Sequence, residues 1–396
     1  MSHPRSETPP RTSGFAGTWA IPIVYAVAVL ARSSIIIVIP TLAFDSLGAA
    51  SLVSVVYLTA SGCGLVMSMA APQVLQSIGP WGVTILASIS GLAAALMFCV
   101  PGPATLIAGL ALHFLMVQLF ETATNVYALN TISRRDLARF EPRRIMLAGF
   151  AYIAGPAIGA LLLAHGASWS PFLLSGLCVV LVPFLVAGLV PNARYRAPPS
   201  IVAVRGGFAV RQFLRQPRLR LAWMLAIGRA GWWQMFFVYT PILAAIGGIG
   251  VGQTGTIASA ASALLLLAPL WGLVLRKLGL RRFMFLAYAT CGAATALAGL
   301  LAGWSFGWAA AALIVSAIAI SGVDSAGNTP FMRAVRIRDR TRMVPIYNTY
   351  REMSQLVPAM VYAVLLTTFG VGSVFIVSGL ALGVMSIFCR RLPRRA

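Results

Sequence analysis

Charge is scarce in this sequence, and negative charge is the scarcest. Only 10% of the 396 residues are charged, with 8 Asp and Glu against 30 Lys and Arg. Hydrophobic residues make up 59% of the chain, and its mean hydropathy is +0.87. A soluble domain does not stay in solution with so little charge on so apolar a chain. The composition therefore excludes a soluble protein and indicates an integral membrane protein.

Motifs that carry enzymatic chemistry are missing as well. The sequence has no P-loop, no nucleophile elbow and no metal-ligand spacing. All five cysteines fall within predicted helices without C-x-x-C spacing, and we interpret them as small packing residues: Cys63, Cys99, Cys178, Cys291 and Cys389. We therefore expect no enzyme, no cofactor and no bound metal.

Long apolar runs, in contrast, are abundant. An α-helix needs about 20 residues to cross the hydrocarbon core of a bilayer, and runs of this length recur along the whole chain. The predicted spans are 19–40, 49–71, 81–100, 104–127, 145–165, 170–190, 221–245, 250–274, 283–302, 306–327, 344–368 and 371–389. The first run is too long for a signal peptide and no A-x-A cleavage pattern follows it, so we interpret it as a retained helix.

Basic residues outside these spans all fall on one side of the predicted topology. The connections of the opposite side, such as "AAIGGIGVGQTG" and "LLTTFGVGS", carry no Lys or Arg. This pattern follows the positive-inside rule and predicts that both termini are cytoplasmic. We expect the net charge of +22 to meet anionic lipid and not nucleic acid. The use of arginine with a single lysine, Lys277, and the compact loops favour a bacterial inner membrane.

The sequence also repeats itself. A shift of 203 residues places "ETATN" (121–125) on "DSAGN" (324–328) and "FLLSGL" (172–177) on "FIVSGL" (375–380). We interpret this as one unit used twice in the same membrane orientation. The predicted organisation is a tail (1–18), a six-helix bundle (19–190), a basic linker (191–220), a second bundle (221–389) and a basic tail (390–396).

Two parallel six-helix repeats with a basic cytoplasmic linker resemble the major facilitator superfamily of secondary transporters. The family signature G-x-x-x-D-R-x-G-R-R between helices 2 and 3 is reduced here to "PQVLQSIGPW", which keeps Gly79. Its repeat copy, "GLVLRKLGLR", has Arg276 in place of the acid but keeps four residues of the family's gating loop: Gly272, Lys277, Gly279 and Arg281. The resemblance implies an all-α membrane fold of twelve helices in two pseudo-symmetric bundles, a monomer and a small-molecule substrate.

Six charged residues lie within predicted spans, where each costs about 2.5–3.5 kcal/mol at a helix centre and so needs a partner, an aqueous cavity or a function. In the family that this chain resembles, helices 1, 4, 7 and 10 line the central cavity, and four of the six residues lie one on each: Arg32, Glu121, Arg229 and Asp324. We hypothesise that the two acids carry protons and that the arginines contact an anionic or polar group of the substrate. The alternative is that ion pairs between these helices are purely structural.

Polar residues recur at helical spacing around the two acids. Gln118 and Asn125 share a helix face with Glu121, and Asn328 shares one with Asp324, which indicates a wet face on each helix. Six more residues, from spans 7 and 11, complete the predicted substrate-contacting set: Trp232, Trp233, Tyr350, Arg351, Glu352 and Gln355.

The fifth span carries "GFAYIAGPAIGA", which resembles the GPxxGG signature of the family's proton-coupled exporters through Gly155, Pro156 and Gly159. Glycines let another helix approach closely, and the proline allows a bend. We therefore predict a proton-coupled secondary active transporter that works by alternating access, with export favoured slightly. One alternative is proton-linked uptake of a small organic anion. Another is a non-transporting sensor or assembly factor with the same fold.

Overall fold

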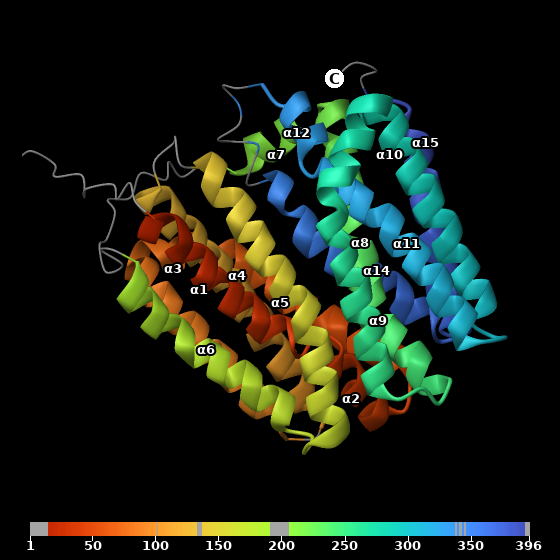
Figure 1. The fold of residues 1–396 in the computed structure, drawn as a ribbon, viewed down its shortest axis with the longest axis horizontal. Helices are drawn as coiled ribbons and strands as arrows, with labels where there is room; N and C mark the ends of the chain where they lie inside the picture. Colours follow the sequence, from red (N-terminus) through yellow and green to blue (C-terminus); the bar gives the residue numbers. More distant parts are fainter. Residues whose placement is uncertain are drawn as a thin grey trace, which may run out of the picture.

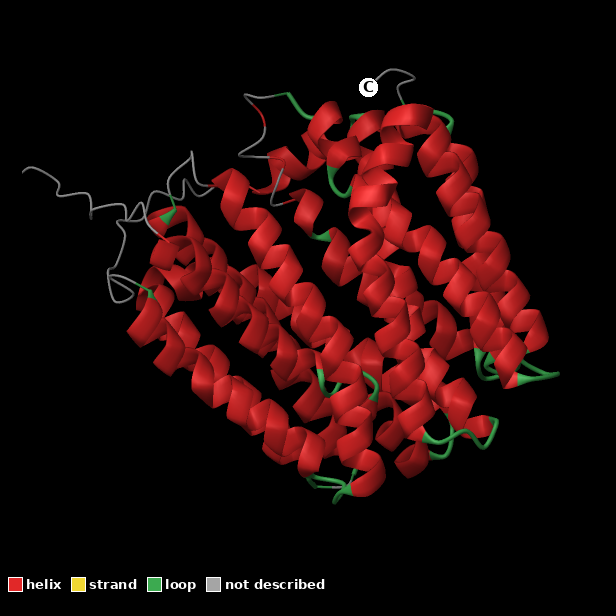
Figure 2. Cartoon of the chain, viewed as in Figure 1, coloured by secondary structure: helices red, strands yellow, loops and turns green. Residues whose placement is uncertain are grey.

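The computed structural model describes residues 15–100, 102–132, 137–190, 206–336, 339, 343 and 346–392. Regular structure in these ranges is helical, with no strand among the described residues (Figure 2). Helices satisfy their backbone hydrogen bonds internally, which a lipid environment requires. The prediction of an all-α fold is confirmed. Residues 1–14 of the predicted N-terminal tail and half of the predicted linker lie outside the described residues, and the last four residues of that tail belong to the first helix.

The first half of the chain forms a bundle of long helices (Figure 1). Its elements are α1 (Phe15–Ser33), α2 (Val38–Leu47), α3 (Ala50–Phe98), α4 (Pro103–Thr131), α5 (Leu137–His165) and α6 (Ser170–Leu189). A turn over residues 34–37 divides the first predicted span into α1 and α2. The second and third predicted spans together form α3.

The second half forms another bundle beside the first, coloured green to blue in Figure 1. Its elements are α7 (Gly206–Leu214), α8 (Pro217–Ile246), α9 (Val251–Ala263), the 3-10 helix η1 (Leu264–Leu267), α10 (Ala268–Leu301), α11 (Phe306–Ala326), α12 (Thr329–Ala334), α14 (Tyr350–Leu365) and α15 (Gly372–Cys389). The short helices α7 and α12 lie at the same end of the molecule as the C-terminus (Figure 1).

Nine segments of the described chain are long and apolar enough to cross a membrane. One of them, Val251–Leu301, is 51 residues long and contains two predicted spans. Two further predicted spans fall outside the nine: α8, whose arginine and tryptophans lower its hydropathy, and α14, which has only 16 residues. The helix count is consistent with the twelve predicted spans.

A glycine reverses the chain at the same place in each half. Gly79 within α3 has φ 73° and ψ 174°, and Gly279 within α10 has φ 75° and ψ 154°. This left-handed region is costly for residues that carry a Cβ. The turn between two antiparallel helices therefore explains why both copies of the family signature keep a glycine at this position.

The break after α1 packs against the glycines of α5. A Cβ added at Gly155 would overlap the side chain of Ser33, and one added at Gly159 would overlap the carbonyl oxygen of Ser34. Ser33 also donates a hydrogen bond from Oγ to the carbonyl oxygen of Ala151, at 2.9 Å. These close contacts explain why the motif on α5 needs small residues at these two positions.

The same motif also faces the second bundle. A Cβ added at Gly255 of α9 would overlap the Cβ of Ala160 and would lie 2.9 Å from the carbonyl oxygen of Pro156. The two bundles also meet where Ser54 of α3 and Tyr239 of α8 share a buried hydrogen bond of 2.8 Å. The largest cluster of buried apolar side chains contains residues of both halves. The bundles are therefore packed together by α2, α3 and α5 against α8, α9 and α14.

Candidate functional site

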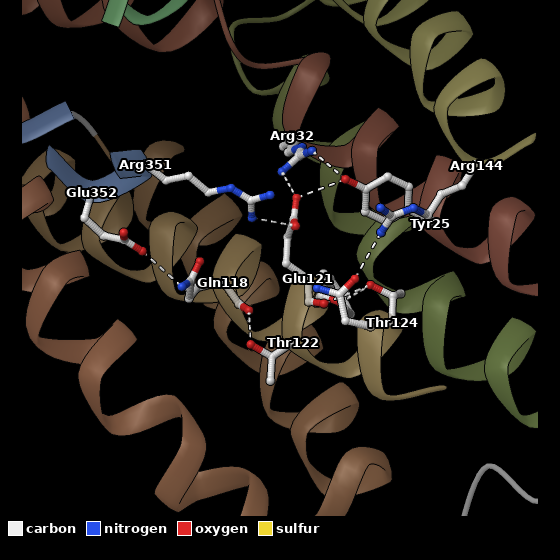
Figure 3. A network of polar contacts seen from close by, with 11 residues as sticks. Tyr25, Arg32, Gln118, Glu121, Thr122, Thr124, Arg144, Arg351 and Glu352 are labelled. Atoms are coloured by element: carbon white, nitrogen blue, oxygen red, sulfur yellow. Dashed lines mark hydrogen bonds and ion pairs between the residues drawn. The ribbon is translucent and has the colours of Figure 1, made fainter. Parts of the chain in front are cut away.

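Glu121 of α4 is held by three side chains from two other helices (Figure 3). Its Oε1 accepts hydrogen bonds from the Tyr25 hydroxyl at 3.0 Å and from Nη1 of Arg32 at 3.3 Å. Its Oε2 accepts one from Nη1 of Arg351 at 2.9 Å. We call Tyr25, Arg32, Glu121 and Arg351 the Glu121 cluster. Because α14 belongs to the second half, this cluster joins the two bundles.

The α1 members of the cluster are seven residues apart, which places them on one helix face. Nη2 of Arg32 donates to the Tyr25 hydroxyl at 3.4 Å, and the Arg32 guanidinium carbon lies 5.4 Å from the centre of the Tyr152 ring. The exposed fraction of the side chain is 16% for Arg32 and 13% for Glu121, but 47% for Arg351. The arginine from the opposite bundle is therefore the accessible one.

A second polar contact lies one helical turn away and also joins α4 to α14. Nε2 of Gln118 donates to Oε1 of Glu352 at 3.1 Å (Figure 3). Glu352 follows Arg351 directly, so consecutive residues at the start of α14 bond to two residues of α4. Helical spacing on α4 explains this, since Gln118 and Glu121 lie on one face.

Asp324 of α11 has partners on α8 only, among the described side chains. Its Oδ1 lies 3.5 Å from Nε of Arg229, and its Oδ2 accepts a hydrogen bond from Nε1 of Trp233 at 2.7 Å. Exposed fractions are 12% for the Arg229 side chain and 25% for that of Asp324. We call Arg229, Trp233 and Asp324 the Asp324 cluster. The structure thus places each of the two acids in an ion pair between cavity helices, and it adds Tyr25 and Trp233 as hydrogen-bond donors.

The neighbouring tryptophan, Trp232, points elsewhere. It is 1% exposed, it stacks on Phe236, and its Nε1 donates to Oγ1 of Thr295 at 2.9 Å. Adjacent helical residues differ by about 100° in direction, so only one of the two indoles reaches Asp324. The predicted substrate contact at Trp232 is corrected to a packing position in the second bundle.

Tyr350 lies between the two clusters. Its ring centre is 6.0 Å from the guanidinium carbon of Arg351 and 5.7 Å from that of Arg229. The tyrosine is 8% exposed and packs beside Tyr347. One aromatic ring thus separates the arginines of the two clusters.

The remaining predicted polar residues have local surroundings. Asn125 accepts a hydrogen bond from Nη1 of Arg144 at 3.0 Å, and Asn328 accepts one from the Tyr347 hydroxyl at 3.1 Å. Gln355 lies one turn beyond Arg351 on α14 and is half-buried. Sequence reasoning missed Arg144, which lies in the loop-proximal part of α5 and gave no signal of its own.

Of the predicted gating loop, Gly279 makes the turn within α10 described above. Lys277 is exposed, Arg281 is half-buried, and Gly272 has open space where a Cβ would lie. The gating role of these residues stays a prediction.

Comparison with known proteins identifies the family. A family model described as Major Facilitator Superfamily matches residues 21–357. The chain belongs to the major facilitator superfamily. The resemblance seen in the repeats is confirmed, and family membership makes the protein a multi-pass membrane transporter.

Solved structures of other transporters share the fold at low identity. The nucleoside transporter NupG has a TM-score of 0.71 and 13% identity, covering 94% of this chain and 98% of its own. A POT family transporter in complex with 5-aminolevulinic acid has a TM-score of 0.73 and 13% identity, covering 96% and 97%. A bacterial metal transporter has a TM-score of 0.69 and 13% identity, covering 96% and 98%. Comparison with curated proteins found no match.

Proposed function

We propose that the protein is a proton-coupled secondary active transporter that moves a small molecule across the bacterial inner membrane by alternating access. In this proposal Glu121 is the group that couples protonation to movement of the bundles. The observation that carries it is the position of Glu121 between Arg32 of its own bundle and Arg351 of the other. Asp324 serves as a second proton-carrying candidate within one bundle.

The coupling follows from the charge of the carboxylate. Protonation of Glu121 removes its negative charge and with it the ionic attraction to Arg351. This weakens a contact between the bundles. A carboxylate that loses its positive partner is in turn more easily protonated. A substrate that occupies Arg351 and a proton that occupies Glu121 therefore favour each other.

Purified protein in detergent tests the proposal. A panel of small molecules is added to the wild type, to Glu121→Gln and to Asp324→Asn in weak buffer, and proton uptake or release is recorded. We expect a ligand-evoked proton signal in the wild type that Glu121→Gln abolishes. Ligand binding without any proton change in all three proteins would overturn the coupling. Inertness of the wild type in liposomes across the same panel would support a sensor or assembly factor instead.

The direction of transport depends on the sign of the coupling. A substrate that competes with the proton is exported as protons enter, whereas one that binds together with the proton is taken up. Export is supported by the α5 motif, which resembles the exporter signature and whose glycines pack closely against the α1 break. Uptake of a small organic anion is supported by the two arginines that share Glu121.

A further inference from the structure

We infer that the substrate is an organic oxyanion, whose carboxylate or phosphate group replaces the Glu121 carboxylate on Arg351 while Glu121 takes a proton from water. The inference rests on the proposed proton coupling at Glu121 and names the substrate class of that same site. It is carried by the charge balance of the Glu121 cluster, by the exposure of Arg351 and by an unused donor on Arg32.

The charge balance of the cluster favours an anion. Two guanidiniums share one carboxylate, which leaves a surplus of one positive charge. Nearby, Arg144 adds a positive charge and Glu352 a negative one, so the surplus is unchanged. Protonation of Glu121 raises the surplus to two, and a bound monoanion restores it to one. The site therefore has the same net charge with and without its load of one anion and one proton.

The exposure of the arginines gives the anion a route. The Arg351 side chain is 47% exposed, whereas those of Arg32 and Glu121 are 16% and 13% exposed. An oxyanion can reach the Arg351 guanidinium directly, because this group offers several N–H donors in a planar fork that matches a carboxylate or phosphate. It then competes with Glu121 for the same donors.

Arg32, the buried arginine of the cluster, has an N–H donor without a partner among the described residues. Nε of Arg32 is buried and has no hydrogen-bond partner in the part of the chain that the structure describes. Its Nη1 reaches Glu121 only at 3.3 Å. Buried donors are normally paired, and an oxyanion placed between the two guanidiniums supplies more acceptor sites than one carboxylate does. The cluster is thus better satisfied with an added anion than without it.

The surroundings favour an organic anion over an inorganic one. The centre of the Tyr350 ring lies 6.0 Å from the guanidinium carbon of Arg351. The guanidinium carbon of Arg32 lies 6.0 Å from the centre of the Tyr25 ring and 5.4 Å from that of the Tyr152 ring. These aromatic faces offer apolar surface beside the anionic group. The Asp324 cluster lacks the surplus charge, since one guanidinium there faces one carboxylate.

A transported anion that binds together with a proton moves in the direction of the proton gradient. The inference therefore selects uptake over export. It also predicts electroneutral transport of a monoanion, because each anion carries one proton across with it.

Replacement of the missing carboxylate provides a test that does not require the natural substrate. In Glu121→Ala the two guanidiniums lose their carboxylate. Thermal unfolding is measured in detergent with sodium acetate, sodium phosphate or sodium chloride at equal ionic strength and pH. We expect acetate or phosphate to raise the midpoint by a few degrees more than chloride does, and the double variant Glu121→Ala/Arg351→Gln to lose this difference. Equal effects of the oxyanions and chloride overturn the inference.

Two further arms complete the test. If Glu121→Ala does not fold, Glu121→Gln is used, because it keeps the shape of the side chain without its charge. The wild type is then titrated with benzoate, benzamide and benzylamine, which share a ring and differ in charge. Tighter binding of benzoate with uptake of about one proton supports the inference; tighter binding of benzamide or benzylamine overturns it. A third outcome is that benzylamine evokes a proton signal while acetate and phosphate do not stabilise the Glu121 variant. This outcome would keep the proposed proton-coupled transport and overturn only the assignment of an oxyanion as substrate.

Discussion

Glu121 and Asp324 occupy the same position in two copies of one sequence unit, yet their surroundings differ. Glu121 bonds across the bundle interface to Arg351, whereas Asp324 bonds to Arg229 and Trp233 within its own bundle. Their neighbours one turn earlier repeat the contrast. Gln118 crosses to Glu352, while its counterpart, Ser321, accepts a hydrogen bond from Trp271 of the same half.

The source of the difference is α14. A shift of 203 residues places Arg351 on Ala148, a buried alanine of α5. The first half thus has no arginine that could reach across to Asp324 from that position. A duplicated fold thus keeps an ion pair in each half, and charged residues on a helix of the second half add contacts between the bundles at Glu121 and Gln118.

The largest expected effect comes from removing each carboxylate. Breaking a buried ion pair by deleting one partner costs about 3–5 kcal/mol. We expect Glu121→Ala to reach this range, because it leaves two guanidiniums without their carboxylate. Asp324→Ala leaves one guanidinium without its carboxylate. Water can reach this more exposed site and solvate the guanidinium, so we expect a smaller loss of stability. Thermal unfolding in detergent compares them, and a lower midpoint for Asp324→Ala would contradict the proposed contrast.

Substitution of one arginine in each cluster should affect different helices. We expect Arg351→Ala to increase backbone hydrogen exchange in both α4 and α14 several-fold, because it removes a bond between bundles. Arg229→Ala should increase exchange in α8 and α11 and leave α4 unchanged. Exchange followed by mass spectrometry in detergent measures both variants. Confinement of the Arg351→Ala effect to the second bundle would show that the contact carries no coupling.

The adjacent residues Trp232 and Trp233 allow the hydrogen bond to Asp324 to be compared with a hydrogen bond in the core. Trp233→Phe removes a donor to a carboxylate, and such bonds contribute about 1.5–3 kcal/mol. Trp232→Phe removes a bond to the hydroxyl of Thr295, worth about 1 kcal/mol. Thermal unfolding should therefore show the larger loss for Trp233→Phe, with the Trp232→Phe variant as the matched control. A larger loss for Trp232→Phe would contradict this expectation and show that the hydrogen bond of Trp232 in the core contributes more to stability.

The smallest effect is expected at the neighbours of the acids. Gln118→Ala and Ser321→Ala each remove one hydrogen bond, worth about 0.5–1.5 kcal/mol. Their stability losses should be similar, but only Gln118→Ala should raise hydrogen exchange at the start of α14. An equal response of α14 to both variants would show that the Gln118–Glu352 bond is not a specific link.

Much of this site could be predicted from one sequence. The length of the apolar runs predicts helices that span a bilayer, and the shift of 203 residues predicts two related halves. Helical spacing places Gln118 and Glu121 on one face, and the cost of isolated charges in a membrane predicts partners for both acids. The depth of Arg229 and Asp324 along their helices favours that pair, whereas the pair of Arg32 with Glu121 is established by the structure.

Other features depended on contacts between distant helices. Periodicity places Arg351 near the start of a helix, but it does not say that this helix meets α4 of the other half. It also does not distinguish Trp232 from Trp233, because the direction of each indole is set by the helices that pack against α8. The apolar run predicts continuous helix through residues 34–37, where the structure has the turn that ends α1.

Hydrophobic length and buried charge are local properties with large energies, and they are enough to predict the class of fold, the repeat and the residues that need a partner. Which partners these residues obtain depends on contacts between helices that are distant in the chain. Glu121 shares two arginines, one from each bundle, because the start of α14 lies beside the middle of α4. That proximity depends on the packing of one whole bundle against the other, which no local pattern encodes.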